Sequence, residues 1–273
     1  MPEVSIVIPA YNEESRLLKT LESVHQCLSA READFEIVVV DDGSTDTTVN
    51  LVDQFAMHHD GVRLISYSPN QGKGHAVRTG IRAAKGDLIL IDDADGSAPI
   101  AELSRLEDAI SAGADIAIGS RNMPDQNRVI NALAYRKYIG NTFNIIVQSL
   151  LLPGVRDTQC GFKLFKWQVA QDIFSVAAQN GFAFDVEILY IAKIRGYKIS
   201  EIAIDWSNVE GSKVNLVIDS LKMLLEVLKI RITALIGGYK KLERNGRPVH
   251  LEQPVLPLKE LPRPAQEPNQ PDV

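Results

Sequence analysis

The sequence predicts an α/β protein in which a mostly parallel central sheet carries helices on both faces. Three observations lead to this fold class. Short runs of apolar, often β-branched residues alternate with amphipathic helical segments between Val4 and Arg121. The strand segments are apolar at consecutive positions, which is typical of strands buried on both faces. The loops between the segments are short, and such an alternation produces parallel sheets with helical layers on each side.

Five strands and four helices are expected in this first half. Ser44 is the expected N-cap of the second helix, because its hydroxyl can accept a hydrogen bond from a free backbone N–H. Pro99 stands near the first turn of the fourth helix, where proline is tolerated. The expected strands are Val4–Ile8, Phe35–Val40, Val62–Ser66, Asp87–Ile91 and Ala114–Ile118. The expected helices are Glu13–Ala30, Ser44–Met57, Ala76–Ala84 and Pro99–Ala112.

The second half has a different pattern. A strongly apolar helical stretch is expected at Ile130–Leu152, and two further helices precede a strand at Tyr197–Asp205. The next helix, Val214–Thr233, carries a narrow polar stripe on an otherwise apolar cylinder. The segment from Asn245 onward holds seven of the 13 prolines and has no periodicity, so a disordered tail is expected there.

Composition excludes several classes of protein. A net charge of −6 argues against nucleic acid as a partner, because no basic block offsets phosphate repulsion. The two cysteines, Cys27 and Cys160, are too far apart in sequence for a C-x-x-C pair, so a disulfide framework or a zinc site is not expected. The first residues read as a strand rather than a signal peptide, and no apolar run reaches the ~18 residues of a membrane span. We therefore expect a cytoplasmic protein, soluble or peripherally attached to a membrane.

The most informative stretch is Ile89–Ser97, where a short apolar strand runs into three carboxylates, Asp92, Asp93 and Asp95. Two carboxylates separated by one small residue at a strand end could reach one Mg²⁺ or Mn²⁺ ion, usually alongside substrate phosphates. The alternative is a solvated acidic turn. Ligands of such sheets bind outside the carboxyl ends of the strands. The other polar loops expected at this edge are Pro9–Glu13, Asp41–Asp46 and Gly119–Arg121, and this clustering favours the metal site.

Several motifs together resemble those of family 2 glycosyltransferases with a GT-A fold. In the first half they are P-A-Y-N-E from Pro9, V-V-D-D-G-S-T-D from Val39, N-Q-G-K-G from Asn70 and D-A-D-G-S from Asp93. In the second half, R-D-T-Q-C-G-F-K-L-F, G-F-A-F-D-V-E and W-x-x-x-x-G-S-K resemble the dolichyl-phosphate β-glucosyltransferases. The sister mannosyltransferases carry other residues in several of these blocks. The resemblance covers about Val4 to Lys229.

The resemblance implies a donor site for a nucleotide sugar. Asp93 and Asp95 would hold Mg²⁺ or Mn²⁺, with Ser97 as a third candidate ligand and Asp92 orienting the others. Arg121 and Lys213 would hold the donor diphosphate, whose leaving charge the ion neutralises. The residues implied in nucleoside and donor binding are Pro9, Tyr11, Glu13, Val40, Asp42, Lys73, Asp93, Ala94, Asp95, Arg121 and Lys213. For the first two motifs the alternative is a pair of turns that cap helices, Asn12 and Ser44 included.

The Gly-rich loop Asn70–Gly74 resembles a phosphate cradle, since glycines admit close backbone approach and Lys73 adds charge. The loop lacks the P-loop pattern, so an ordinary connecting loop is the alternative.

The acceptor implied by the resemblance is a polyprenyl phosphate. Arg136 and Lys163 are the candidate residues for its phosphate and, with Asp95, the candidate catalytic residues; the alternative is solvated surface charge. A hydroxyl acceptor would instead require a general base, for which Asp185 or Glu187 is the candidate. A phosphate monoester is already ionised at neutral pH and requires none.

We therefore expect an inverting transferase that moves glucose from UDP-glucose to a polyprenyl phosphate. Mannosyl transfer from GDP-mannose, transfer to a sugar or protein hydroxyl, and a non-catalytic sugar-nucleotide sensor are the alternatives. One domain is expected over residues 1–244, with a donor part at 1–121 and an acceptor part at 122–213. Residues 214–233 would form an amphipathic, membrane-docking helix, and 245–273 the disordered tail.

The acceptor implies a membrane, because a polyprenyl tail stays in the bilayer. The apolar stretch Ile139–Leu152 and the helix Val214–Ile232 are the candidate docking faces. Packing against the protein's own core, a membrane-protein partner or a second copy of the chain is the alternative for either. Eukaryotic members of the family carry an N-terminal membrane anchor, which we expect to be missing here.

Overall fold

A computed structural model describes residues 2–31, 33–123, 130–131, 147–209, 216–240, 243–244 and 247–248. Contacts group Met1–Lys240 as one compact unit. Of the second unit, Lys241–Val273, the structure describes only strands β10 (Glu243–Arg244) and β11 (Arg247–Pro248), which pair antiparallel. The remainder of the predicted Pro-rich tail lies outside the described residues.

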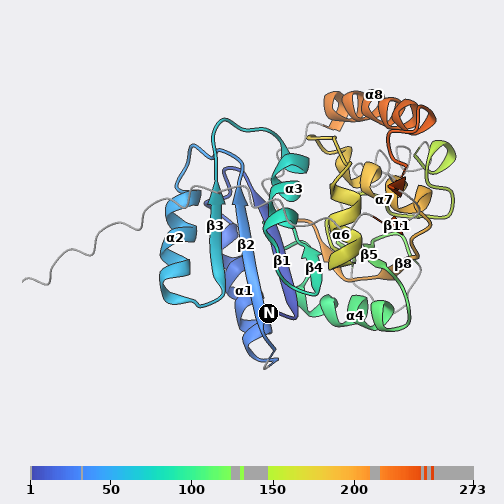
Figure 1. Ribbon diagram of the computed structural model, residues 1–273. Helices are drawn as coiled ribbons and strands as arrows, with labels where there is room; N and C mark the ends of the chain where they lie inside the picture. The colour runs from blue at the N-terminus through green and yellow to red at the C-terminus, as the bar shows by residue number, and fades with distance from the viewer. Residues whose placement is uncertain are drawn as a thin grey trace, which may run out of the picture. The chain divides into compact units, whose positions relative to one another are not determined.

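The first unit is built on a seven-stranded sheet with the order β3-β2-β1-β4-β7-β5-β8 (Figure 1). All neighbouring pairs are parallel except those made by β7, so the predicted mostly parallel sheet is confirmed. A separate pair joins β6 (Ile130–Asn131) to β9 (Trp206–Ser207). The strands of the main sheet are β1 Val4–Ala10, β2 Phe35–Asp41, β3 Val62–Ser66, β4 Leu88–Ile91, β5 Ile116–Ser120, β7 Lys163–Lys166 and β8 Ile199–Ala203.

Strand β7 was not predicted from the sequence. It lies antiparallel between β4 and β5, with Leu164 opposite both Leu90 and Ala117. With four residues it is too short to show a periodicity of its own, and its place in the sheet depends on partners far away in the sequence. Through β7 the second half of the chain forms part of the same sheet as the first.

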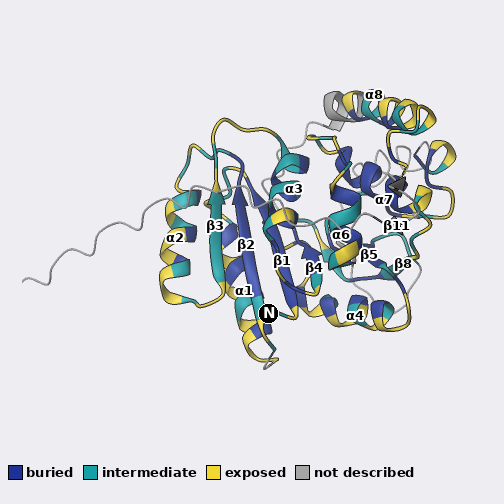
Figure 2. Cartoon of the chain, in the orientation of Figure 1, coloured by how far each residue is buried: buried dark blue, intermediate teal, exposed yellow. Residues whose placement is uncertain are grey.

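Helices cover both faces of the sheet, and each face has its own apolar core (Figure 2). On one face, α1 (Leu17–Ser29), α2 (Thr48–His58) and α4 (Leu103–Ser111) pack through side chains such as Leu21 and Leu106. On the other face lie α3 (Lys73–Ala83), α6 (Trp167–Phe174) and α7 (Phe184–Ile194), with α8 (Leu216–Leu235) contributing to the same cluster. Alternate strand residues point to opposite faces, as Val7 and Ile8 do.

Several predicted element boundaries differ from those in the structure, as the first helix shows by beginning at Leu17 rather than Glu13. Helix α2 begins at Thr48, and Ser44 does not cap it, because the Ser44 hydroxyl accepts the backbone N–H of Asn12 instead. Helix α3 begins at Lys73 rather than Ala76, so the end of the Gly-rich loop is its first turn. Ile130 belongs to β6 instead of a long helix; most of that predicted helix lies outside the described residues.

In the part of the chain that the structure describes, no helix combines the length and the apolar character needed to cross a membrane.

Candidate active site

The loops that carry most of the candidate site residues lie at the carboxyl edge of the parallel strands. The loops after β1, β2, β4 and β5 all leave the sheet at this edge, because these strands run parallel. They carry, in turn, Tyr11, Asp42, Asp93 and Arg121. The antiparallel β7 begins at the same edge, so the segment that leads into Lys163 also enters the site.

Asp93 and Asp95 are both partly exposed, with 34% and 27% of their side chains accessible. Asp95 Oδ1 accepts the backbone N–H of Ser97 at 2.9 Å, which fixes the turn after β4. Ser97 itself is largely buried. Asp92 is buried behind the pair, where burial and then the charges of Asp93 and Asp95 raise the pKa of its carboxyl well above the ordinary value.

Ala94 holds this turn against the first helix. Its carbonyl accepts the hydroxyl of Thr20 at 2.9 Å, and the residue is buried. Gly96 has a φ of 64°, and a Cβ there would lie 2.9 Å from the Thr20 hydroxyl oxygen. The backbone between the two carboxylates is therefore fixed by α1 rather than free to adapt.

Lys73 neutralises Asp93. Its Nζ lies 2.6 Å from Asp93 Oδ1 and 5.9 Å from the centroid of the Phe184 ring. Burial acts to raise the pKa of Asp93, but the Lys73 ammonium overcomes this effect and holds the pKa below its ordinary range. Burial likewise acts to lower the pKa of Lys73, and the carboxylates of Asp93 and Asp185 reverse it, so that this pKa is raised.

The glycines beside Lys73 serve packing within the protein. A Cβ on Gly72 would lie 2.5 Å from the carbonyl oxygen of Asn180, and one on Gly74 would lie 2.4 Å from that of Gln179. The Gly74 N–H also donates to the Asn180 carbonyl at 2.7 Å. The Gly-rich loop therefore needs its glycines to approach the backbone of the segment before α7, on either side of Lys73.

The loops after β1 and β2 are tied to each other. Asn12, with a φ of 54°, accepts the backbone N–H of Thr45 at 2.7 Å, and the Glu13 N–H donates to the Thr48 hydroxyl at 2.8 Å. Asn12 and Ser44 thus join the two motifs in place of the helix-capping roles considered for them. The two loops behave as one unit at the sheet edge.

The residues predicted to line the nucleoside pocket have different surroundings. Asp42 is buried, and its carboxylate accepts the backbone N–H groups of Gln71 and Gly72, both at 2.8 Å. The side chain of Val40 is buried in the core, so only its backbone is available to a ligand. Pro9 is buried and Tyr11 is 39% exposed, while Glu13 pairs with Arg16.

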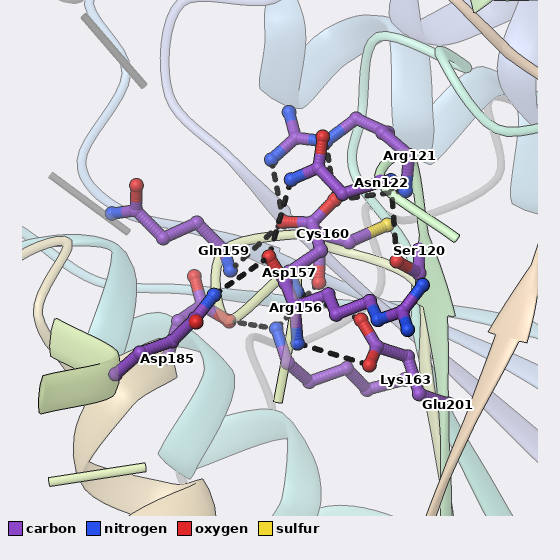
Figure 3. A network of polar contacts seen from close by, with 11 residues as sticks. Ser120, Arg121, Asn122, Arg156, Asp157, Gln159, Cys160, Lys163, Asp185 and Glu201 are labelled. Carbon is purple, nitrogen blue, oxygen red and sulfur yellow. Dashed lines mark hydrogen bonds and ion pairs between the residues drawn. The ribbon is translucent and has the colours of Figure 1, made fainter. Parts of the chain in front are cut away.

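Asp157 was not predicted from the sequence as a site residue, and Figure 3 shows it in a polar network with Arg121. It is fully buried, and it accepts three hydrogen bonds from Arg121: from Nε at 2.7 Å, from Nη2 at 2.9 Å and from the backbone N–H at 2.9 Å. The guanidinium carbon of Arg121 also lies over the Trp206 ring, 5.4 Å from its centroid. The only signal in the sequence was that Asp157 belongs to one of the resembling blocks.

Lys163 does not reach the surface. Its side chain is 0% exposed, and its Nζ lies 2.5 Å from both Asp185 Oδ1 and the Cys160 carbonyl oxygen. Burial raises the pKa of Asp185, and the Lys163 ammonium opposes this rise. In this arrangement Lys163 cannot contact an acceptor phosphate, and it joins β7 to the first turn of α7 instead.

Glu187 is likewise enclosed. Its carboxylate accepts the backbone N–H groups of Ala178 and Gln179 and the Tyr239 hydroxyl at 2.7 Å. Because these three donors occupy it, Glu187 holds the segment before α7 in place. Neither Glu187 nor the paired Asp185 is placed to act as a general base. Arg136 and Lys213, the other two predicted cations, lie outside the described residues.

The carboxylate oxygens at this edge suit a divalent ion that also binds a substrate. No group of three His, Cys, Asp or Glu side chains that could enclose a metal occurs among the described residues. Asp93 and Asp95 offer two hard oxygen ligands at an open edge, and Mg²⁺ typically takes one or two carboxylates together with substrate phosphates. These two residues therefore suit an ion that a diphosphate completes.

Comparison with known proteins agrees with this geometry. A model of the glycosyl transferase family 2 matches residues 5–174. The dolichyl-phosphate β-glucosyltransferase of Dictyostelium discoideum is 35% identical over 87% of this chain and 76% of its own length. The proteins of the same name from Saccharomyces cerevisiae and Homo sapiens are 38% and 36% identical, over 87% of this chain and 76% and 78% of their own.

Solved structures show the same fold at low identity. Glucosyl-3-phosphoglycerate synthase from Mycobacterium tuberculosis in complex with Mn²⁺ and UDP-glucose has a TM-score of 0.62 and 16% identity, over 84% of this chain and 79% of that one. Mannosyl-3-phosphoglycerate synthase from Rubrobacter xylanophilus has a TM-score of 0.64 and 18% identity, over 90% and 79%.

Fold and comparisons together define a glycosyltransferase enzyme with the GT-A fold. Within that class, the chain belongs to glycosyl transferase family 2 and to its dolichyl-phosphate β-glucosyltransferases.

Proposed function

We propose that this enzyme transfers glucose from UDP-glucose to a polyprenyl phosphate of the dolichyl type, at the cytoplasmic face of a membrane and with a divalent ion. The observation that carries the proposal is the similarity over most of the chain to enzymes named for dolichyl phosphate and glucose. The choice of UDP-glucose is supported by a structural neighbour solved with that donor. The alternative donor, GDP-mannose, is retained as a competing outcome of the test below.

The reaction is a displacement at the anomeric carbon of the sugar. An oxygen of the acceptor phosphate attacks this carbon and forms the new C–O bond, while the bond to the nucleoside diphosphate breaks and its electron pair leaves with UDP. Attack from the face opposite the leaving group inverts the configuration. Because the acceptor phosphate is already ionised near pH 7, the site has no need of a general base, which agrees with the enclosure of Asp185 and Glu187.

Positive charge at the site is supplied by the protein and by an ion. Asp93 and Asp95 would hold Mg²⁺ or Mn²⁺, which when bound offsets the charge that develops on the leaving diphosphate. Among the cations at this edge, Lys73 and Arg121 both act electrostatically on Asp93. Their charges favour a diphosphate beside the two carboxylates. Lys213 and Arg136 keep their predicted roles at the donor and acceptor phosphates.

The exposed face of α8 supports a peripheral contact with a membrane. Its inner side chains, Met223, Val227 and Ile230, are buried in the core. Its exposed large apolar side chains are Leu225, Leu228, Ile232 and Leu235, followed by Ile236 just beyond the helix. The exposed charged side chains of residues 222–240 are all basic: Lys222, Lys229, Arg231 and Lys240. Apolar residues bordered by cations suit a bilayer with anionic lipid, although the whole chain is acidic.

Radiolabelled donor tests the proposal directly. We expect purified protein with UDP-[¹⁴C]glucose, Mg²⁺ and dolichyl phosphate in detergent to yield label that extracts into organic solvent. Asp93→Asn and Asp95→Asn should reduce this label at least about 100-fold, because the leaving group loses its counter-charge. The matched control Asp53→Asn changes an exposed carboxylate on α2 and should leave the rate unchanged.

The remaining outcomes separate the alternatives. Label transferred only from GDP-mannose would replace glucose with mannose in the proposal. Transfer to a sugar or peptide hydroxyl, lost on Asp185→Asn or Glu187→Gln, would replace the acceptor. UDP-glucose binding without transfer to any acceptor would overturn the enzyme assignment in favour of a sensor.

A further inference from the structure

The pair formed by Asp157 and Arg121 is unusually complete for two residues 36 positions apart. Asp157 engages the Nε–Nη2 edge of the guanidinium in a two-point contact and also accepts the backbone N–H of Arg121. Two parallel hydrogen bonds fix the plane of a guanidinium, whereas a single bond would leave it free to rotate. The orientation of Arg121 is therefore determined before any ligand arrives.

Asp157 is in turn fixed by β8. The backbone N–H groups of Arg156 and Asp157 donate to the two oxygens of Glu201, at 3.0 Å and 2.7 Å. Asp157 also accepts the backbone N–H of Gln159 at 3.3 Å. Because β8 pairs with β5 along Ile116–Ser120, the carboxylate and its arginine are held by adjacent strands (Figure 3).

One nitrogen of the Arg121 guanidinium, Nη1, is left free by the pair with Asp157. Nη1 donates to no protein acceptor within the described parts of the chain, and 30% of the side chain is exposed, against none of Asp157. Trp206 covers one face of the guanidinium. The arginine thus presents one unoccupied N–H edge from a rigid position.

We propose that Asp157 is a positioning residue that holds the free edge of Arg121 toward the diphosphate of the sugar-nucleotide donor. The inference rests on the proposed function, because it takes the ligand of Arg121 to be that diphosphate. Asp157 touches neither donor nor acceptor and acts only through Arg121. Because Asp157 already restricts the guanidinium, less conformational entropy is lost when the diphosphate binds.

A double-mutant cycle on nucleotide binding tests this role. The affinity for UDP in the presence of Mg²⁺ is measured by calorimetry for the wild type, Asp157→Asn, Arg121→Ala and the double variant. We expect each single variant to bind UDP about tenfold or more weakly, as the loss of a charge-assisted contact implies. The double variant should bind no worse than Arg121→Ala, within about twofold, because Asp157 acts only through Arg121.

The control is Asp115→Asn at the opposite end of β5. Like Asp157, Asp115 accepts hydrogen bonds from a cationic side chain and from a backbone N–H. The donors are Lys166 Nζ, at 3.1 Å, and the backbone N–H of Lys198, at 3.0 Å. This variant should lose a similar kind of contact without changing UDP affinity. If the losses of UDP affinity in Asp157→Asn and Arg121→Ala add up in the double variant, Asp157 has a general structural role. That result would overturn the inference.

Arg121→Lys provides a second test should Asp157→Asn fail to fold. Lysine keeps the charge but cannot make the two-point contact, so we expect UDP affinity to fall nearly as far as in Arg121→Ala. Full affinity in Arg121→Lys would overturn the positioning role. A wild type that binds no UDP would instead overturn the proposed function, so the two failures are distinguishable.

Discussion

Lys73 Nζ and Asp93 Oδ1 lie 2.6 Å apart at the carboxyl edge of the sheet. Asp93 is one of the two carboxylates proposed for the divalent ion, and the ammonium occupies one of the two oxygens that Asp93 could offer the ion. Lys73 is also held in place from behind, because its flanking glycines pack on Gln179 and Asn180. The protein without its donor thus supplies its own counter-charge at the metal site.

Removal of that counter-charge should strengthen binding of the ion alone. We expect Lys73→Met to bind Mn²⁺ several-fold more tightly than the wild type in the absence of nucleotide, because no ammonium competes for Asp93. Electron paramagnetic resonance of free Mn²⁺ measures this affinity without any turnover. Lys19→Met, which changes an exposed lysine on α1, is the control. Unchanged or weaker Mn²⁺ binding in Lys73→Met would contradict the competition.

Gly161 provides a steric test of the same carboxylate. A Cβ on Gly161 would lie 2.2 Å from Asp93 Oδ2, so the carboxylate must move in Gly161→Ala. We expect UDP binding with Mg²⁺ to weaken about tenfold, as the loss of one charged contact implies, with little change in the melting temperature. Gly181→Ala is the matched control, since its Cβ would meet the end of the Glu226 side chain at a milder 3.2 Å. Equal affinities for the two variants would show that the position of Asp93 is not critical.

The buried carboxylate of Asp157 should make stability depend on pH. Burial acts to raise its pKa, but Arg121 overcomes this and holds the pKa below its ordinary value. A carboxylate whose pKa is lower in the folded protein than in the unfolded chain stabilises the fold at pH values above its unfolded pKa, which is near 3.9. This stabilisation is lost as the pH falls through the folded pKa. We expect Asp157→Asn to cost about 3 kcal/mol at pH 7, as for other broken buried pairs, and progressively less below about pH 4. Urea unfolding at pH 7, 5 and 3 measures the difference, and a cost independent of pH would contradict it.

The two cysteines should differ in reactivity. Burial, and then the nearby Asp157 carboxylate, raise the pKa of the Cys160 thiol to about 12, and its side chain is buried. Cys27 is partly exposed. We expect iodoacetamide at pH 8 to modify Cys27 in the native protein and Cys160 only after unfolding, since the thiolate is the reactive form. Peptide mass spectrometry reports both sites, and rapid native labelling of Cys160 would contradict its burial.

The apolar face of α8 should govern membrane binding. Replacing Leu228, Ile232 and Leu235 by Gln removes exposed apolar area, and each side chain that inserts would contribute about 1.5–3 kcal/mol. We expect the triple variant to lose at least tenfold in co-sedimentation with vesicles that contain phosphatidylserine. Met57→Gln changes an equally exposed apolar side chain on α2 and is the control. Wild-type protein that fails to sediment with these vesicles would point to a protein partner for this face.

The sequence alone was sufficient for the parallel part of the fold. The strand Phe35–Asp41, for example, contains the unbroken apolar run Ile37–Val40 before its final aspartate, and such a run is typical of a strand buried on both faces. The carboxyl-edge rule then placed the loops that carry Asp42, Asp93 and Arg121 at one edge of the sheet, where the loops after β2, β4 and β5 lie. These predictions succeeded because they depend on local pattern and on a general property of parallel sheets.

Other features depend on contacts between distant segments. The resemblance made Lys163 a candidate for the acceptor phosphate, but Lys163 is enclosed by Asp185 on α7 and by the insertion of β7. The glycines of the loop Asn70–Gly74 suggested a phosphate cradle, whereas their close neighbour is the backbone of Asn180. A local sequence pattern shows that glycines allow another group to come close to the backbone. It does not show whether that group is a bound phosphate or another segment of the chain.

The insertion of β7 between β4 and β5 has a consequence for how the chain is made. During synthesis, Leu88–Ile91 and Ile116–Ser120 emerge well before Lys163–Lys166, which alone bridges them in the sheet. Until then, two apolar strand edges have no partner, and such edges are prone to pair with other chains. A nascent or truncated chain that ends before β7 is therefore a natural client for a molecular chaperone. For the same reason, the donor-binding part is not expected to be obtained as a separate folded fragment.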